Sequence, residues 1–289
     1  MQTDGHAFMA LSVLDRQRLE RGAYSGDARC GLPRVGASAT VQPVGPPPLP
    51  QQVDVLQRVL DRITAVEDGG RPPLVVCDLD GTLFDNRPRT LQILIEYADE
   101  VRDEYPDVAE ALTTLQLEGV QYLLSDTLRE CGLTHVEIVR DISLYWRERF
   151  YSEDYLTYDE PFLGATDYVN ACHDAGATIV YVTNRDVPGM LLGTVASLRE
   201  HGLPIGVVGV ELVLKPDASM GDEAFKRMVL PTLTQLGDVV GFFDNEPANC
   251  NIARSFFPDA EVALLETQKV AGAPTPEEGV AHVSDFRIL

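Results

Sequence analysis

Basic residues are scarce in this sequence. Its 289 residues include 23 Lys and Arg against 45 Asp and Glu, which gives a formal net charge of -22. Nucleic acids and anionic membrane surfaces bind proteins through clustered Lys and Arg. The composition therefore argues against nucleic acid or a membrane as a partner. A small phosphorylated metabolite remains compatible only where a metal ion or local cations reverse the negative field.

Cysteine and histidine are also few, and neither has the spacing of a metal site. The five cysteines are far apart and include no Cys-x-x-Cys pair. A disulfide framework or a zinc site is therefore not expected, and a reducing compartment fits best. The five histidines show no metal-ligand spacing either. No P-loop or dinucleotide-binding fingerprint is present.

Long apolar stretches are missing as well. No segment approaches the roughly 18 apolar residues that a bilayer-spanning helix needs. The sequence begins Met1-Gln2-Thr3-Asp4, without a basic region followed by an apolar run. We therefore expect a cytoplasmic protein. The sequence does not indicate its oligomeric state.

The first 52 residues differ in composition from the rest. Gly and Pro are frequent there, and the stretch from Gly45 to Pro50 reads Gly-Pro-Pro-Pro-Leu-Pro. Such a segment buries little surface, so residues 1–52 are predicted to be a disordered tail. From Val53, apolar residues recur at intervals of three and four, which predicts a helix that ends before Gly69.

Five short apolar runs predict a parallel sheet, because strands buried on both faces are rich in Val and Ile. They are residues 74–78, 178–183, 205–213, 239–243 and 262–265. Helical patterns at 188–201, 219–236 and 247–256 separate the last four runs. This alternation predicts an α/β fold with a doubly wound, Rossmann-like parallel sheet and helices on both faces.

The interval between the first two strands is long and helical. It holds helical patterns at 89–104, 107–117, 121–131 and 134–150. We predict a helical cap at residues 89–159, inserted into an α/β core of residues 53–88 and 160–289. An insert at this place would lie over the carboxyl ends of the strands and act as a lid. The alternative is that these helices extend the core.

Polar residues stand at the ends of three of the predicted strands: Asp78, Thr183 and Asp244. Ligands bind at the carboxyl ends of the strands in such sheets. Asp78 and Asp80 flank Leu79 directly after a buried strand, and this pair can hold Mg²⁺ through oxygen ligands. Asp78 can then attack phosphate as a nucleophile, while Asp80 protonates the leaving oxygen and later activates water. Gly81 leaves room for the backbone to approach an anion.

The run from Asp78 to Leu83, Asp-Leu-Asp-Gly-Thr-Leu, resembles the first motif of the haloacid dehalogenase superfamily of phosphatases and phosphotransferases. The resemblance extends over about residues 74–265. It implies a core with an inserted cap, a Mg²⁺ cofactor, and an aspartyl-phosphate on Asp78. Gly81 and Thr82 become candidates for contact with the substrate.

Later segments match the remaining family motifs in order. The second motif is matched by Thr183, which would contact the transferred phosphoryl group, and by Asn184 and Arg185 as further substrate contacts. The third motif requires a lysine, and both Lys226 and Lys215 are candidates, with Lys226 favoured. The fourth motif is acidic and is matched by Asp244, which completes a predicted metal site with Asp78 and Asp80. Asn245 stands where many relatives have a second acid, so Asn245 and Glu246 are alternatives for the outer metal ligand.

The resemblance predicts a magnesium-dependent phosphatase that hydrolyses a small phosphomonoester. Two alternatives remain open at this point. The first is a phosphotransferase or phosphomutase, which the same residues would serve. The second is a non-catalytic module that binds a phosphorylated ligand, although an intact set of Asp78, Asp80 and Thr183 argues against it.

Overall fold

A parallel sheet organises the chain. The computed structural model describes residues 48–67 and 69–288. Within these ranges a six-stranded sheet has the order β5-β4-β1-β6-β7-β8, and every neighbouring pair runs parallel. The strands are β1 (Pro73–Cys77), β4 (Thr178–Asp186), β5 (Val210–Lys215), β6 (Asp238–Asp244), β7 (Glu261–Leu265) and β8 (Ala281–Val283). This confirms the predicted Rossmann-like α/β fold.

Strand β1 lies at the centre and is buried over its whole length. Its side chains alternate between the two faces of the sheet, as the pleat requires. Leu74 and Val76 pack into one hydrophobic cluster, and Val75 and Cys77 pack into the other. A near-continuous apolar run is therefore what this position demands.

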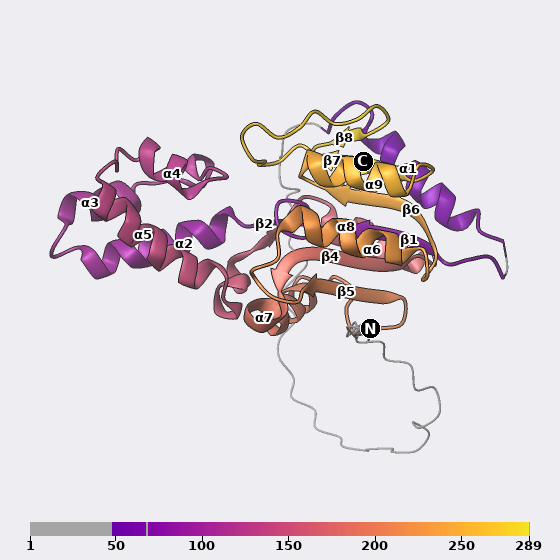
Figure 1. Cartoon of the computed structure of the whole chain (residues 1–289), viewed down its shortest axis with the longest axis horizontal. Helices are drawn as coiled ribbons and strands as arrows, with labels where there is room; N and C mark the ends of the chain where they lie inside the picture. The colour runs from indigo at the N-terminus through magenta and orange to yellow at the C-terminus, as the bar shows by residue number, and fades with distance from the viewer. Residues whose placement is uncertain (1–47, 68, 289) are drawn as a thin grey trace, which may run out of the picture. The chain divides into compact units, whose positions relative to one another are not determined.

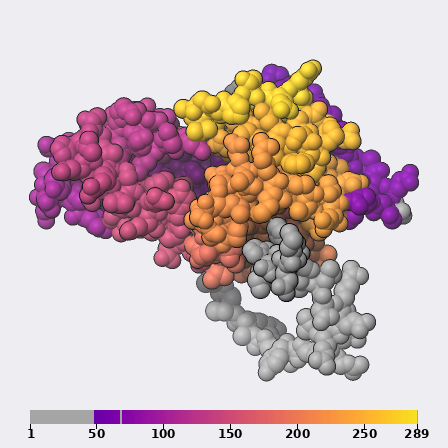
Figure 2. All heavy atoms as spheres, viewed as in Figure 1, coloured from indigo at the N-terminus to yellow at the C-terminus, as the bar shows by residue number. Residues whose placement is uncertain are grey.

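Helices cover both faces of the sheet. Helices α1 (Gln52–Thr64) and α6 (Ala165–Asp174) contribute to the cluster that contains Val75. Helices α8 (Asp222–Leu233) and α9 (Pro247–Phe256) contribute to the opposite cluster and lie in front of the strands in Figure 1. Their atoms, in orange and yellow, cover that face of the sheet in Figure 2.

The order of the strands makes the carboxyl end of β1 the expected place for a ligand. The chain runs from β1 to β4 and then outward to β5 through helix α7 (Val187–Glu200). It then returns to β6, on the other side of β1, and continues to β7 and β8. The carboxyl ends of strands next to such a reversal form the usual ligand site of open α/β sheets. The loops after β1, β4 and β6 meet there.

In the chain, the inserted helical cap comes between β1 and β4. It consists of α2 (Arg87–Val101), α3 (Pro106–Thr113), η1 (Leu117–Gly119), α4 (Leu124–Glu130), α5 (Val136–Phe150) and η2 (Glu153–Tyr158). Its helices form one group in Figure 1 and have a hydrophobic cluster of their own, which includes Leu94, Leu112 and Ile142. Two short antiparallel strands, β2 (Phe84–Asp85) and β3 (Glu160–Pro161), join its two ends.

Several predicted boundaries differ from the structure. The third predicted strand, 205–213, begins only at Val210, because Gly206 and Gly209 adopt positive φ angles of 70° and 80° in a turn. The interval after β1 was predicted to be helical, yet it also contains the short strands β2 and β3. Helix α6 and strand β8 were not predicted. The division into core and cap at residues 89 and 159 stays a prediction.

The predicted tail falls mostly outside the described residues, as does Cys30. Its last residue does not belong to a tail, because Gln52 is the first residue of α1 and is fully buried. Gln52 Nε2 donates a hydrogen bond of 2.7 Å to Asp285 Oδ1 and thereby connects α1 to the C-terminal segment. Among the described helices, none combines the length and the apolar character that crossing a membrane requires.

Candidate active site

The turn after β1 positions the first motif. The Asp78 amide donates to the carbonyl oxygen of Phe243 on β6 at 3.0 Å, which extends the sheet pairing to the nucleophile candidate. Gly81 has a φ of 80°, a conformation that side chains rarely tolerate. A Cβ atom at Gly81 would also lie 2.4 Å from Asn245 Nδ2. Glycine is therefore required here by both the backbone and its neighbour.

Lys226 joins two of the predicted carboxylates. Its ammonium group, which comes from α8, donates to Asp78 Oδ1 at 2.8 Å and to Asp244 Oδ2 at 3.0 Å. It also donates to the carbonyl oxygen of Val182 at 2.7 Å, so all three of its hydrogens are used. The structure thus brings Asp78, Asp244 and Lys226 together at the ends of β1, β4 and β6. We call these three residues the lysine cluster.

The lysine cluster is buried and has an excess of negative charge. The side chains of Lys226 and Asp244 are fully buried, and that of Asp78 is 8 % exposed. Burial raises the pKa of Asp78, and the nearby charges of Asp244 and Asp80 add to this effect. Burial alone would lower the pKa of Lys226, but the attraction of Asp244 and Asp78 outweighs it, so the lysine stays protonated.

The backbone and helix α9 hold Asp244 from its other side. Asp244 Oδ1 accepts a hydrogen bond from the Glu246 amide at 2.9 Å and from Asn249 Nδ2 at 3.1 Å. The sequence did not single out Asn249, whose only signal is its position in the first turn of a helix that follows the acidic motif. Its buried amide fixes the orientation of the Asp244 carboxylate.

Asp80 belongs to a second group, which we call the arginine cluster: Asp80, Arg89, Asp159 and Arg185. Asp80 Oδ2 accepts from Arg185 Nε at 2.8 Å, and Asp80 Oδ1 accepts from Arg185 Nη2 at 3.0 Å and from Arg89 Nη2. Burial would raise the pKa of Asp80, but the charges of Arg185 and Arg89 outweigh it and hold that pKa well below its usual range. The structure therefore turns the Asp80 carboxylate toward arginines.

Polar groups of the second and fourth motifs surround the lysine cluster. Thr183 is fully buried, and its hydroxyl accepts a hydrogen bond from the Arg185 amide at 3.3 Å. Thr82 Oγ1 lies 3.4 Å from Asp78 Oδ2 and 3.3 Å from Asn245 Oδ1. Asn184 Oδ1 is buried without a hydrogen-bond partner among the described residues. Such an atom is costly unless a ligand satisfies it.

Asn245 and Glu246, the two candidates for the outer metal ligand, differ in their contacts. Asn245 Nδ2 donates to the carbonyl oxygen of Gln268 at 2.7 Å, and the N-cap residue of α9 is Glu246, whose side chain makes no capping hydrogen bond. Glu246 Oε1 is buried and has no partner among the described residues. The choice between the two as an outer metal ligand stays open.

Lys215 lies elsewhere. Its ammonium donates to Asp222 Oδ1 at 2.8 Å and to the carbonyl oxygen of Met220 at 3.2 Å. Of the two lysine candidates, the structure therefore places Lys226, and not Lys215, on Asp78.

The charges of the lysine cluster fit a divalent cation. Among residues 48–67 and 69–288, no three acidic, histidine or cysteine side chains are arranged to hold a metal ion. Asp78 and Asp244 nevertheless share one ammonium group, which leaves one negative charge uncompensated in a buried place. Carboxylate oxygens are the ligands that Mg²⁺ prefers. Asp78 and Asp244 thus suit Mg²⁺, whereas both oxygens of Asp80 are engaged by arginines.

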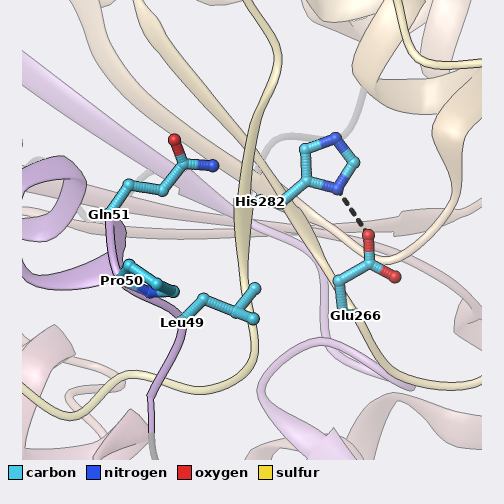
Figure 3. Close-up of a pocket in the computed structure, with 5 residues that line it drawn as sticks. All are labelled: Leu49, Pro50, Gln51, Glu266 and His282. Atoms are coloured by element: carbon cyan, nitrogen blue, oxygen red, sulfur yellow. Dashed lines mark hydrogen bonds and ion pairs between the residues drawn. The ribbon is translucent and has the colours of Figure 1, made fainter.

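A hollow of about 520 Å³ lies outside the lysine and arginine clusters (Figure 3). It is lined by Leu49, Pro50, Gln51, Glu266 and His282, none of which is a predicted site residue. In Figure 3 the His282 ring points to Glu266, to which it is hydrogen-bonded.

The model of the haloacid dehalogenase-like hydrolase family matches residues 72–234, more than half of the chain. None of the curated proteins matches the sequence. The described fold is similar to several solved structures. Protein Tyrosine Kinase A of Mycobacterium tuberculosis is 20 % identical over 74 % of this chain and 94 % of that one, with a TM-score of 0.46.

Two further solved structures are similar at low identity. A class C acid phosphatase from Bacillus anthracis with tungstate bound is 20 % identical, with a TM-score of 0.37, over 69 % of this chain and 62 % of that one. A hydrolase from Streptococcus pneumoniae is 12 % identical, with a TM-score of 0.41, over 64 % and 89 % of the two chains.

Proposed function

The chain belongs to the haloacid dehalogenase-like hydrolases, and we propose that it is a magnesium-dependent phosphatase acting on small phosphomonoesters. The observation that carries this proposal is the lysine cluster. A buried ammonium group contacts both an aspartate that follows β1 and an aspartate that ends β6. An anionic substrate and a carboxylate nucleophile repel each other; the Lys226 ammonium group offsets part of this repulsion, and a bound Mg²⁺ would offset the rest.

Asp78 is the proposed nucleophile. Its Oδ1 accepts from Lys226, while the contact at its Oδ2 within the described residues is the Thr82 hydroxyl at 3.4 Å. In the first step an Asp78 oxygen forms a bond to phosphorus, the ester P–O bond breaks, and the leaving oxygen takes a proton from Asp80. Because its arginines hold Asp80 as a carboxylate, Asp80 must first turn away from them and take up a proton from water before it can protonate that oxygen.

The second step regenerates the enzyme. Asp80 accepts a proton from water, the water oxygen bonds to phosphorus, and the bond between phosphorus and Asp78 breaks to release phosphate. Lys226 holds Asp78 in place, and Thr183 offers its hydroxyl to a phosphoryl oxygen. Asn184, with its unpartnered buried oxygen, is a further candidate for contact with the substrate.

Asp78 and Asp244 would hold Mg²⁺, with Glu246 or Asn245 as an outer contact. When bound, Mg²⁺ supplies positive charge that offsets the charge of the phosphoryl oxygens. We also propose a reducing compartment such as the cytoplasm, which is supported by four free cysteines among the described residues, Cys77, Cys131, Cys172 and Cys250.

The test is phosphate release from p-nitrophenyl phosphate and from a panel of phosphorylated metabolites, with and without Mg²⁺. We expect turnover with Mg²⁺ and a loss on the order of 10³-fold or more in Asp78→Asn. Asp103→Asn, at an exposed position on the cap, is the matched control. Folded protein that releases phosphate from no ester, or Asp78→Asn with undiminished turnover, would refute the proposal. An isomerised product with little free phosphate would indicate a mutase instead.

A further inference from the structure

The arginine cluster ties both ends of the cap to Asp80. Arg89 lies in the first turn of α2, and Asp159 follows η2, at the other end of the insert. Arg89 Nε and Nη2 donate to the two oxygens of Asp159 at 2.8 and 2.9 Å, which is a bidentate pair. Arg185 Nη2 donates to the same Asp159 at 2.8 Å. Each of the two arginines therefore contacts both Asp159 and Asp80.

Burial distinguishes the two carboxylates of this cluster. The side chains of Arg89 and Asp159 are fully buried, and that of Arg185 is 1 % exposed. Asp80 is 26 % exposed and is thus the member that solvent reaches. Arg89 is further fixed by the Phe150 carbonyl oxygen at 2.9 Å and by the Phe150 ring, whose centroid is 4.2 Å from its guanidinium carbon. The arginines and Asp159 are consequently enclosed, whereas Asp80 is the member of the cluster with a side open to solvent.

The departure of Asp80 would leave this site with an excess of positive charge. This step rests on the proposed function, in which Asp80 turns to the leaving oxygen. Among the described residues, two guanidinium groups would then face one carboxylate, Asp159, in a buried place. Uncompensated buried charge is costly, so another anion would be favoured at the vacated position. The fork of a guanidinium matches a carboxylate, which is the group that occupies the position now.

We propose that Arg89 and Arg185 bind a carboxylate of the substrate, which replaces Asp80 when Asp80 moves to its catalytic position. The substrate is then a short phosphorylated hydroxy acid. Its carboxylate and phosphate must be close together, because Asp80 follows Asp78 by two residues, and their Cα atoms are at most about 7 Å apart. The exchange of one carboxylate for another keeps the cluster neutral, and the substrate itself releases the proton donor.

The test compares two esters with the same carbon skeleton, 3-phosphoglycerate and glycerol 3-phosphate, which differ in a carboxylate against a hydroxymethyl group. We expect kcat/KM for 3-phosphoglycerate to be about tenfold or more higher, since a site built for a polar group discriminates against analogues that lack it. In Arg89→Met we expect this ratio to fall toward one, and Arg89→Lys should restore part of it.

The matched control is Arg102→Met. Arg102 is the C-cap residue of the same helix, is 54 % exposed and pairs with Asp99. The Arg102→Met substitution removes the same charge from the cap, about 20 Å along the helix from Arg89. The ratio of the two kcat/KM values should stay as in the unmodified protein. A ratio near one in the unmodified protein, or an unchanged ratio in Arg89→Met, overturns the inference.

A measurement on the unmodified protein covers the case in which Arg89→Met does not fold. Glycerate should inhibit hydrolysis of p-nitrophenyl phosphate at a concentration about tenfold lower than glycerol does. Equal inhibition overturns the inference. The proposed phosphatase activity can be judged separately. If p-nitrophenyl phosphate is hydrolysed, and glycerol 3-phosphate is hydrolysed as well as 3-phosphoglycerate, only the substrate class is wrong. If no ester is hydrolysed, the phosphatase itself is refuted.

Discussion

The lysine cluster and the arginine cluster each contain an aspartate from the turn after β1, Asp78 and Asp80, yet the two clusters differ in charge balance. The lysine cluster has two carboxylates and one ammonium group, and the arginine cluster has two carboxylates and two guanidinium groups. The first is therefore short of one positive charge, and the second is neutral. This difference favours a cation at the lysine cluster and an exchange of anions at the arginine cluster.

The two clusters also differ in origin. The lysine cluster is built from strand ends and one helix of the α/β core, whereas the arginine cluster takes Arg89 and Asp159 from the two ends of the cap. The α/β core thus holds the proposed nucleophile, and the ends of the cap hold the proposed proton donor. Any change in the cap that moves its ends would act on Asp80 before it acted on Asp78.

The largest effect is expected from Lys226→Met. It leaves Asp78 and Asp244 buried without their cation, and breaking a buried pair in this way costs about 3–5 kcal/mol of unfolding free energy. Phosphate release should also fall on the order of 10³-fold. Urea unfolding and a phosphate assay measure the two effects.

Lys215→Met is the control for this change: the Lys215 side chain is only 10 % exposed, but its partner Asp222 is 62 % exposed, so the substitution leaves no buried carboxylate without a partner. Its cost should stay below about 1 kcal/mol, with turnover little changed. Equal losses in the two variants would contradict the assignment of Lys226 to the site.

An intermediate effect is expected from Mg²⁺ itself. If the lysine cluster binds the cation, Mg²⁺ at about 100 times its dissociation constant should add about 2.7 kcal/mol to the unfolding free energy. Asp244→Asn should lose this gain. Asp80→Asn should keep it, because the Asp80 carboxylate lies on the arginines. Thermal unfolding with and without Mg²⁺ checks both variants. If Asp80→Asn also loses the stabilisation by Mg²⁺, the cation binds at Asp80, and its assignment to the lysine cluster is wrong.

The sequence predicted the fold class and the family because both depend on local patterns. Buried parallel strands are continuous apolar runs, and the first motif follows a strand that is buried over its whole length. The pattern of residues alone was therefore enough to place Asp78 and Asp244 at strand ends. Thr183 was expected to end its strand, but β4 continues to Asp186 after an irregular register. The beginning of β5 was wrong because the turn glycines lie within an apolar run.

The arginine cluster could not be predicted, because its pairing depends on distant parts of the chain. Arg89 and Asp159 are 70 residues apart in sequence. An arginine on an amphipathic helix and an acid in a polar segment are normally solvated, and neither residue has a sequence neighbour that indicates burial. The contact of Asn249 with Asp244 could not be predicted for the same reason. Its role follows only from the place where the first turns of α9 meet the end of β6.

The smallest effect is expected from Asn249→Ala, which acts on the lysine cluster through Asp244 alone. Loss of the hydrogen bond to Asp244 Oδ1 should cost about 1 kcal/mol, since the Glu246 amide still donates to that oxygen. The Mg²⁺ concentration for half-maximal activity should rise about tenfold, because partners that orient a metal-binding carboxylate set its affinity. Asn251→Ala, on the same helix, also loses hydrogen bonds, which join it to Thr275 and Glu277. Its stability should fall by a similar amount, but its Mg²⁺ requirement should not change. If both variants shift that requirement equally, Asn249 acts on the helix as a whole and does not orient Asp244.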